Sequence, residues 1–172
     1  MVGSERMVEE ADLPSLVYTQ AVVKETFRKH NPAPLLLQHM STQACTVLGY
    51  SLPQGTTLLV NAWAIGQDPQ TWDDPQRFWP ERFLGAACRE VDVCGQHFEL
   101  LPFGSGRRSC PGMSLALPIV QLTVSSLIHT FQWALPSDDH IIDMSENFGT
   151  VVGPRSPLMA IPSLRLGKSY RP

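Results

Sequence analysis

The sequence predicts a mainly α-helical protein with small β-sheets, an α+β fold. Two stretches, one before Asn31 and one after Pro111, place apolar side chains at helical spacing. Elsewhere, short apolar runs alternate with turn residues, a pattern typical of short strands. With 172 residues, 43% of them hydrophobic and 17% charged, the chain is long enough for one globular core, so we expect one domain or part of one.

The first helix is expected to begin at a cap formed by Asp12 or Ser15 and to end at about Lys29. Within it Glu25 and Arg28 stand three residues apart, so they share a face and can pair. Spacing alone favours a solvated surface pair worth only a few tenths of a kcal/mol. The apolar stripe of this helix consists of Leu16, Val17, Ala21, Val22 and Phe27.

Short strands in one small sheet are predicted between Ala33 and Val60. The apolar runs are Pro34 to Leu37, Thr46 to Leu48 and Thr57 to Val60, and Gly49 to Gly55 separates the last two.

A short helix is expected from Asn61 to Gly66, followed by an irregular meander rich in Trp, Asp and Pro. Trp72, Phe78 and Trp79 add apolar area to this meander, and packing explains them better than a binding platform does.

The second long helix should begin almost at Cys110. Its apolar positions are Leu115, Ile119, Val120, Leu122, Val124, Leu127 and Ile128. Pro118 lacks an amide, so we expect a kink or a local break there. From Phe131 onward we expect two or three strands and a turn, built on short pieces such as Val151-Val152 and Leu158 to Ile161.

A glycine-rich loop, Pro102 to Gly112, carries Cys110 to the start of this helix. Unpaired amides and the positive end of the helix dipole stabilise an anion there, so the cysteine tends to be a thiolate, a good metal ligand or nucleophile. Arg107 and Arg108 act in the same direction. The glycines let a large flat group lie against the chain, and Phe103 offers an aromatic face. The alternative is a buried core cysteine.

Composition excludes several other classes of protein. A net charge of −3 without a basic block argues against nucleic-acid binding. The first ten residues are too charged for a signal peptide, and no apolar run approaches the roughly 18 residues that span a bilayer. The four cysteines are expected to be reduced. Cys88, Cys94 and His97 are spaced too loosely for a typical zinc site, so loop thiols are the default.

Three motifs resemble those of the cytochrome P-450 monooxygenases. Phe103, Gly106, Arg108, Cys110 and Gly112 match that family's pattern Phe-x-x-Gly-x-Arg-x-Cys-x-Gly. The stretch from Glu25 to Arg28 is similar to its Glu-x-x-Arg motif, and the stretch from Pro80 to Phe83 to the later motif whose arginine, Arg82 here, completes a cluster. The resemblance implies a partial cytochrome P-450 fold, with residues 1–172 forming a single incomplete domain, the carboxy-terminal haem-ligand portion.

The resemblance also implies a cofactor, haem b, with Cys110 as the ligand of its iron. The sulfur of such a ligand donates electron density that helps to split the O–O bond. Glu25, Arg28 and Arg82 would meet below the haem, where two guanidinium groups clamp one carboxylate and fix the loop's register. The implied haem-binding residues are Cys110, Arg108, Phe103, Gly104, Gly106, Gly112 and His39, the last toward a propionate.

The substrate and the electron donor follow from the same resemblance. Ala33, Pro34, Leu35 and Leu36, with the turn at Thr150, Val151 and Val152, would form an apolar wall of the substrate pocket; ordinary strand core is the alternative. Arg77, Arg89 and Arg107 would meet the acidic face of an NADPH-cytochrome reductase, unless they are simply scattered solvated arginines.

The implied activity is insertion of one oxygen atom from O₂ into an apolar small molecule. The residues of the stretches Leu101 to Arg108 and Pro69 to Phe83 look most like those of plant microsomal members that oxidise flavonoids, phenylpropanoids or related metabolites. No acid-Thr pair in a Gly/Ala-rich helix is present, so no catalytic residue for oxygen activation is expected. We interpret Met1 as the start of a truncated product, which makes a non-catalytic haem-binding fragment the alternative.

The full-length family implies the cytosolic face of the endoplasmic reticulum membrane, although we expect no targeting or transmembrane segment in this chain.

Overall fold

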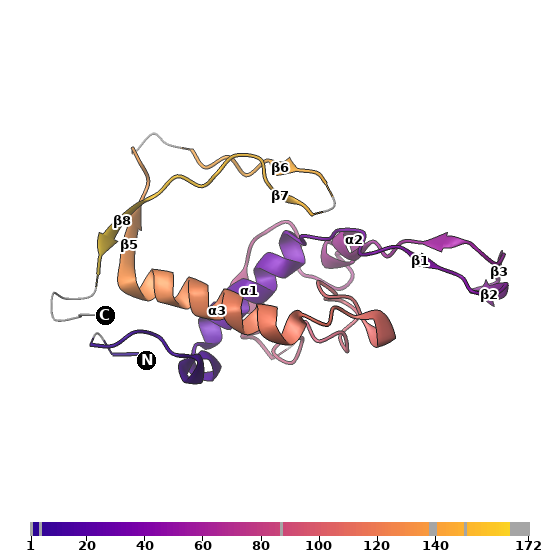
Figure 1. Ribbon diagram of the computed structural model, residues 1–172, viewed down its shortest axis with the longest axis horizontal. Helices are drawn as coiled ribbons and strands as arrows, with labels where there is room; N and C mark the ends of the chain where they lie inside the picture. Colours follow the sequence, from indigo (N-terminus) through magenta and orange to yellow (C-terminus); the bar gives the residue numbers. More distant parts are fainter. Residues whose placement is uncertain (1, 4, 87, 138–140, 150, 166–172) are drawn as a thin grey trace.

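Two helices that cross near the centre of the molecule organise this computed structural model (Figure 1). The structure describes residues 2–3, 5–86, 88–137, 141–149 and 151–165. Helix α1 spans Val17–Lys29, and helix α3 spans Met113–Thr130 and packs against it. The strands that the structure describes form small two-stranded antiparallel sheets. The predicted α+β class is therefore confirmed.

The start of the first helix differs from the prediction. A short 3-10 helix, η1 (Glu10–Ser15), precedes α1, and Leu16 stands at the N-cap of α1 without a side-chain cap. The Asp12 carboxylate accepts the Glu9 amide at 2.9 Å and so caps η1 instead. The predicted end at Lys29 is correct.

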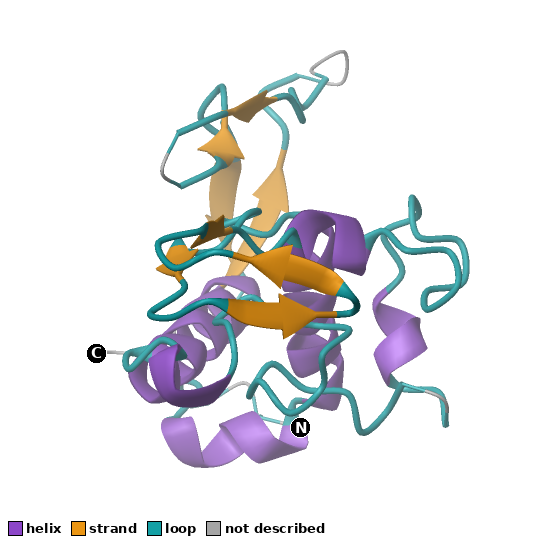
Figure 2. Ribbon diagram, turned by 90° about the vertical axis from the view of Figure 1, so that its right-hand side faces the viewer, coloured by secondary structure: helices purple, strands orange, loops and turns teal. Residues whose placement is uncertain are grey.

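An arm of two strand pairs extends away from the helices, on the right of Figure 1 and toward the viewer in Figure 2. Strand β1 (His39–Met40) pairs with β4 (Thr57–Leu58), and β2 (Cys45–Val47) pairs with β3 (Tyr50–Leu52). The expected single sheet is therefore wrong, and the expected break at 49–55 contains β3.

The run from Pro34 to Leu37 is not a strand. The Leu36 amide donates to the Ala33 carbonyl at 3.0 Å, and Leu36 has a φ of +51°, so the chain turns before it reaches β1.

Helix α2 (Ala62–Gly66) begins where the sequence predicted, because Asn61 Oδ1 accepts the Ala64 amide at 2.9 Å. The meander that follows ends in a 3-10 helix, η2 (Pro80–Phe83). Trp72 is 1% exposed and forms the core with Ala21, Phe83, Val91, Val93 and Leu100. Packing therefore explains Trp72, whereas Phe78 is 43% exposed, and for that residue the prediction is wrong.

Helix α3 begins three residues after Cys110, preceded by the 3-10 helix η3 (Gly106–Arg108). It continues through Pro118 as one element, so the predicted local break is absent. Pro118 lies in the second turn, so its missing amide leaves one carbonyl, that of Ser114, without its usual helical donor, and the helix continues beyond it.

Helix α3 also corrects the expectation that no stretch could span a membrane. Its 18 residues have a mean hydropathy of 1.3, enough by length and composition alone. The expectation failed because polar residues interrupt every apolar run of this helix. None of them carries a carboxylate, ammonium or guanidinium group, so the mean hydropathy stays high. Much of its apolar surface is exposed, at Leu115, Ile119, Val120, Leu127 and Ile128.

The tail rises above the helices in both views (Figures 1 and 2). Strand β5 (Phe131–Ala134) pairs with β8 (Ile161–Leu164), and between them β6 (Glu146–Asn147) pairs with β7 (Gly153–Pro154). In the part of the tail that the structure describes, four short strands thus replace the two or three predicted. Val151-Val152 is not a strand; the Val152 amide instead donates to the Pro32 carbonyl at 2.8 Å and ties the tail to the end of α1.

Candidate functional site

Three charged side chains from two distant stretches meet at a buried cluster, which we call the Glu25 cluster (Glu25, Arg28 and Arg82). Arg28 Nε lies 2.7 Å from Glu25 Oε2 and Arg28 Nη2 lies 2.9 Å from Oε1, a two-pronged contact. Arg82 Nε lies 3.2 Å from Glu25 Oε2. Glu25 is 0% and Arg28 1% exposed, so the surface-pair interpretation is wrong for this helix face.

Backbone carbonyls of the meander satisfy the remaining guanidinium protons. Arg28 donates to the carbonyls of Gly66 at 2.5 Å and Pro75 at 3.0 Å, and Arg82 donates to that of Asp73 at 2.7 Å. These bonds hold the meander, residues 67–79, against α1. The cluster is thereby both charge-paired and hydrogen-bonded, as burial of three charges requires.

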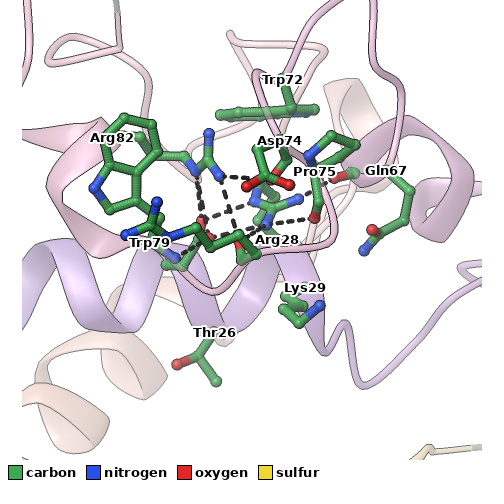
Figure 3. Close-up of polar contacts among 12 residues, drawn as sticks. Thr26, Arg28, Lys29, Gln67, Trp72, Asp74, Pro75, Trp79 and Arg82 are labelled. Atoms are coloured by element: carbon green, nitrogen blue, oxygen red, sulfur yellow. Dashed lines mark hydrogen bonds and ion pairs between the residues drawn. The ribbon is translucent and has the colours of Figure 1, made fainter.

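Two tryptophans complete this arrangement (Figure 3). The Trp72 ring lies over both guanidinium groups, with its centroid 5.5 Å from Arg28 Cζ and 5.9 Å from Arg82 Cζ. The Trp79 amide donates to Glu25 Oε1 at 2.8 Å. The guanidinium groups thus have cation–π contacts, and the carboxylate accepts a further hydrogen bond beyond those from the two arginines.

The loop that carries Cys110 packs against α1, the helix that also carries Glu25 and Arg28. Phe103 packs edge-on against Phe27 of α1, with ring centroids 5.2 Å apart. The Phe103 carbonyl accepts the Cys110 amide at 2.9 Å, which closes the loop. Gly104 and Gly106 both have a φ of +72°, a conformation that side chains disfavour. Cys110 itself is exposed and free, so it is not the buried core cysteine of the alternative interpretation.

Side chains near the thiol leave room on its face of the loop. Gly112 contributes no side chain there, and a Cβ at that position would lie 3.8 Å from Cys110 Sγ. Arg107 and Arg108 are both exposed. A thiol at a helix N-terminus, beside two cations and glycine backbone, can bind a metal within a large flat anionic group.

The two other loop thiols in this region have a different chemistry. Burial raises the pKa of Cys88, and burial together with Asp92 raises the pKa of Cys94, so both favour the neutral thiol. Among the residues that the structure describes, no three His, Cys, Asp or Glu side chains gather as a metal site.

The residues predicted to line a substrate pocket come from two segments that meet where the Val152 amide bonds to the Pro32 carbonyl. Leu36 also approaches the Cys110 loop, because its Cδ1 would lie 3.9 Å from a Cβ at Gly104. Val151 is exposed in the tail, and Thr150 lies outside the described residues, as does Met1. Ala33, Pro34 and Leu35 precede the arm, and Leu35 is exposed.

His39 is exposed in strand β1, opposite Leu58. Of the three arginines predicted to meet a reductase, Arg77, Arg89 and Arg107, all are exposed.

A cavity of about 700 Å³, which was not predicted, lies between the end of α1 and the tail. Its apolar lining includes Ile141, Ile142, Met144, Leu158 and Met159. His30 Nδ1 and Glu146 Oε1 meet 3.1 Å apart in its wall. These two residues are 116 positions apart, so no local pattern could have paired them.

Comparison with known families agrees with this geometry. The family model described as cytochrome P-450 matches residues 1–161, and the chain belongs to that family.

Plant members are among its similar relatives. A flavonoid 3′,5′-hydroxylase from Crocosmia x crocosmiiflora is 49% identical over 175 residues, which covers 99% of this chain and 33% of that protein. A flavonoid 3′-monooxygenase from Petunia hybrida is 46% identical, with 96% of this chain and 33% of that protein covered. The chain therefore spans about a third of the length of these relatives.

A solved structure with the same fold is a zebra fish cytochrome P-450 with abiraterone. It superimposes with a TM-score of 0.83 at 36% identity, covering 95% of this chain and 37% of that one. The predicted partial cytochrome P-450 fold is confirmed.

Proposed function

We propose that this chain is the carboxy-terminal haem-ligand portion of a plant haem-thiolate monooxygenase, with residues 1–172 as one incomplete domain. The enzyme inserts one oxygen atom from O₂ into an apolar small molecule. The observation that carries this proposal is the exposed Cys110 thiol on a closed glycine loop at the start of α3, packed through Phe103 against Phe27, which lies in the same turn of α1 as Glu25 and Arg28.

The chemistry of the loop suits haem b. Cys110 would bind the iron, whose thiolate ligation helps to split the O–O bond. Gly104, Gly106 and Gly112 would let the porphyrin approach the backbone, and Phe103 would pack beside it. Arg108 and His39 would offer cations or hydrogen bonds to its propionates.

The substrate that we propose is a plant specialised metabolite, a flavonoid or a phenylpropanoid. Relatives at 46–49% identity are named for flavonoid oxidation. Ala33, Pro34, Leu35, Leu36 and Val151 would supply an apolar wall to such a substrate.

Membership of the family implies a redox partner, and we propose an NADPH-cytochrome reductase at the endoplasmic reticulum membrane. The exposed Arg77, Arg89 and Arg107 would attract its acidic face. Charge reversal at these three positions should slow electron transfer most at low salt, and reversal of the exposed Arg155 in the tail is the matched control. Equal effects of both changes would remove these arginines from the docking face.

A second candidate is a haem-binding chain without turnover. It rests on the same exposed Cys110 thiol, because binding haem through this loop does not by itself require turnover.

One spectrum and one product assay test both candidates. The purified chain is loaded with haem, reduced and exposed to carbon monoxide, and a thiolate-bound iron gives a strongly red-shifted absorption band. Cys110→Ala should abolish that band, whereas Cys45→Ala, which removes an exposed thiol from β2, should leave it unchanged. A red-shifted band that survives in Cys110→Ala contradicts the ligand assignment.

The product assay then adds reductase, NADPH and a flavonoid. Hydroxylated product supports the monooxygenase, and a red-shifted band without product supports the second candidate.

A further inference from the structure

The segment Val91 to Gly95 lies between α1 and the loop from Pro102 to Gly112 that carries Cys110, which we call the ligand loop. The first part of the segment is anchored to the core. Lys24 of α1 extends its ammonium group to the Val91 carbonyl, 2.6 Å away. Val93 is 2% exposed within the core that contains Trp72. The segment is therefore a rigid support rather than a free loop.

The far end of this segment touches the ligand loop at Gly95. Gly95 has a φ of +78°, and a Cβ there would lie 2.7 Å from the Gly104 carbonyl oxygen and 3.1 Å from Ser105 Cα. Both neighbours are backbone atoms, which cannot rotate away as a side chain can. The contact is fastened by a hydrogen bond from Ser105 Oγ to the Gly95 carbonyl, 2.6 Å long.

A displacement of the ligand loop at Gly104 would also move the backbone of Cys110. Gly104 follows Phe103, whose carbonyl accepts the Cys110 amide at 2.9 Å. A shift of the Gly104 carbonyl therefore moves the group that holds the Cys110 backbone. Tightly packed backbone transmits such a shift instead of absorbing it.

We propose that Gly95 is a positioning residue for Cys110: the absence of a side chain there sets the distance between the Val91–Gly95 support and the ligand loop. The consequence for iron ligation rests on the proposed function, whereas the consequence for the loop itself does not. Gly95 touches neither the thiol nor the space in front of it and acts only through Gly104 and Ser105.

If Gly95 were needed only for its positive φ, Gly95→Ala would act no differently from alanine at another glycine with the same φ. Gly55 provides that control. Gly55 has nearly the same backbone conformation, with a φ of +82°, but nothing lies within 4 Å of a Cβ at that position. Gly55→Ala therefore introduces the same backbone strain without pressing on any neighbour. Comparison with Gly95→Ala isolates the steric contact.

The first experiment measures amide hydrogen exchange in the full chain without haem. Gly95→Ala should speed exchange of the Cys110 and Ser109 amides by about tenfold or more, as overpacking of a backbone contact implies. Gly55→Ala should affect only residues of the arm. Exchange at Cys110 that is no faster in Gly95→Ala than in Gly55→Ala overturns the proposal.

Ser105→Ala keeps the experiment decisive if Gly95→Ala does not fold. It removes the bond to the Gly95 carbonyl and adds no atom, so the same amides should exchange severalfold faster. Unchanged exchange in that variant counts against the proposal.

The second experiment loads each variant with haem and records the reduced carbon monoxide spectrum. Gly95→Ala should lose a large part of the red-shifted band, and Gly55→Ala should retain it. A wild-type chain without that band refutes the proposed function and leaves the exchange result to judge Gly95. A full band in Gly95→Ala refutes the positioning role even when the loop exchanges faster.

Discussion

The two sides of the ligand loop are built in opposite ways. On α1, which contacts the loop through Phe27 and Phe103, the Glu25 cluster is buried and fully bonded, with Glu25 0% exposed and paired to two guanidinium groups and a backbone amide. In front of it, Cys110 is exposed, and Leu115 on the first turn of α3 is 66% exposed. On one side the polar groups are hydrogen-bonded within the protein, whereas on the other a thiol and an apolar side chain are exposed.

This difference indicates how the chain can hold a thiol in place without enclosing it. A buried carboxylate is stable only with its partners in a narrow range of positions, so the Glu25 cluster specifies one arrangement of the meander and α1. The exposed side contributes few contacts that would fix the arrangement of the chain. Exposed apolar side chains that lie together are typical of a surface that another group covers. The buried cluster therefore fixes the backbone, whereas the thiol side stays accessible.

The strongest test of this contrast removes the carboxylate. Glu25→Ala leaves Arg28 and Arg82 as unpaired buried charges, and we expect it to lower the free energy of unfolding by about 3–5 kcal/mol. Urea unfolding followed by tryptophan fluorescence measures the loss. The matched control is Glu81→Ala, an exposed carboxylate that accepts a bond from the Tyr18 hydroxyl at 3.0 Å. Equal losses in the two variants would contradict the contrast.

A finer test keeps the charge and removes the geometry. Lysine cannot reproduce the bonds of Arg28 to Glu25, Gly66 and Pro75, so Arg28→Lys should destabilise the chain by about 1–3 kcal/mol. Arg77→Lys, at an exposed arginine stacked on Trp79, should change stability by less than about 0.5 kcal/mol. If both substitutions are neutral, charge alone holds the cluster.

The attachment of the tail should be weaker than the cluster. His30 and Glu146 are each about a third exposed, at 32% and 30%, and their contact of 3.1 Å resembles a surface pair. Glu146→Gln should therefore cost about 0.2–1 kcal/mol. The expected signature is faster exchange of the Val152 amide, which is bonded to Pro32, with Glu90→Gln as an exposed control. A loss as large as that of Glu25→Ala would mean that the tail is part of the rigid side.

The smallest effect is expected at the amino-terminal edge. Hydrogen bonds from Arg6, and then from the Glu9 amide, hold the pKa of Asp12 well below its ordinary value of 3.8. Because the folded pKa lies below the unfolded one, this contribution is present above about pH 3.8 and is lost as the pH falls further through the folded pKa.

Limited pepsin cleavage of residues 5–16 between pH 2 and 4 should report that loss. Asp12→Asn, which cannot titrate, should show no such change across this range. The same pH dependence in both chains would assign the loosening to another group.

Local chemistry was enough for part of this molecule. The end of α1 at Lys29, the short helix near Asn61 and the start of α3 after Cys110 were all predicted, because proline, glycine and asparagine act on their immediate neighbours. The glycine spacing around Cys110 likewise indicated a loop that lets a large group approach the backbone, since glycine conformations are a local property.

Long-range packing settled the rest. The spacing of Glu25 and Arg28 favoured a surface pair; burial follows from Arg82, 57 residues away, and from carbonyls of the meander. Carbonyl acceptors, strand partners and the approach of Gly95 to Gly104 leave no side-chain signature, because every residue has the same backbone. Which backbone atoms meet depends on how the whole chain closes on itself.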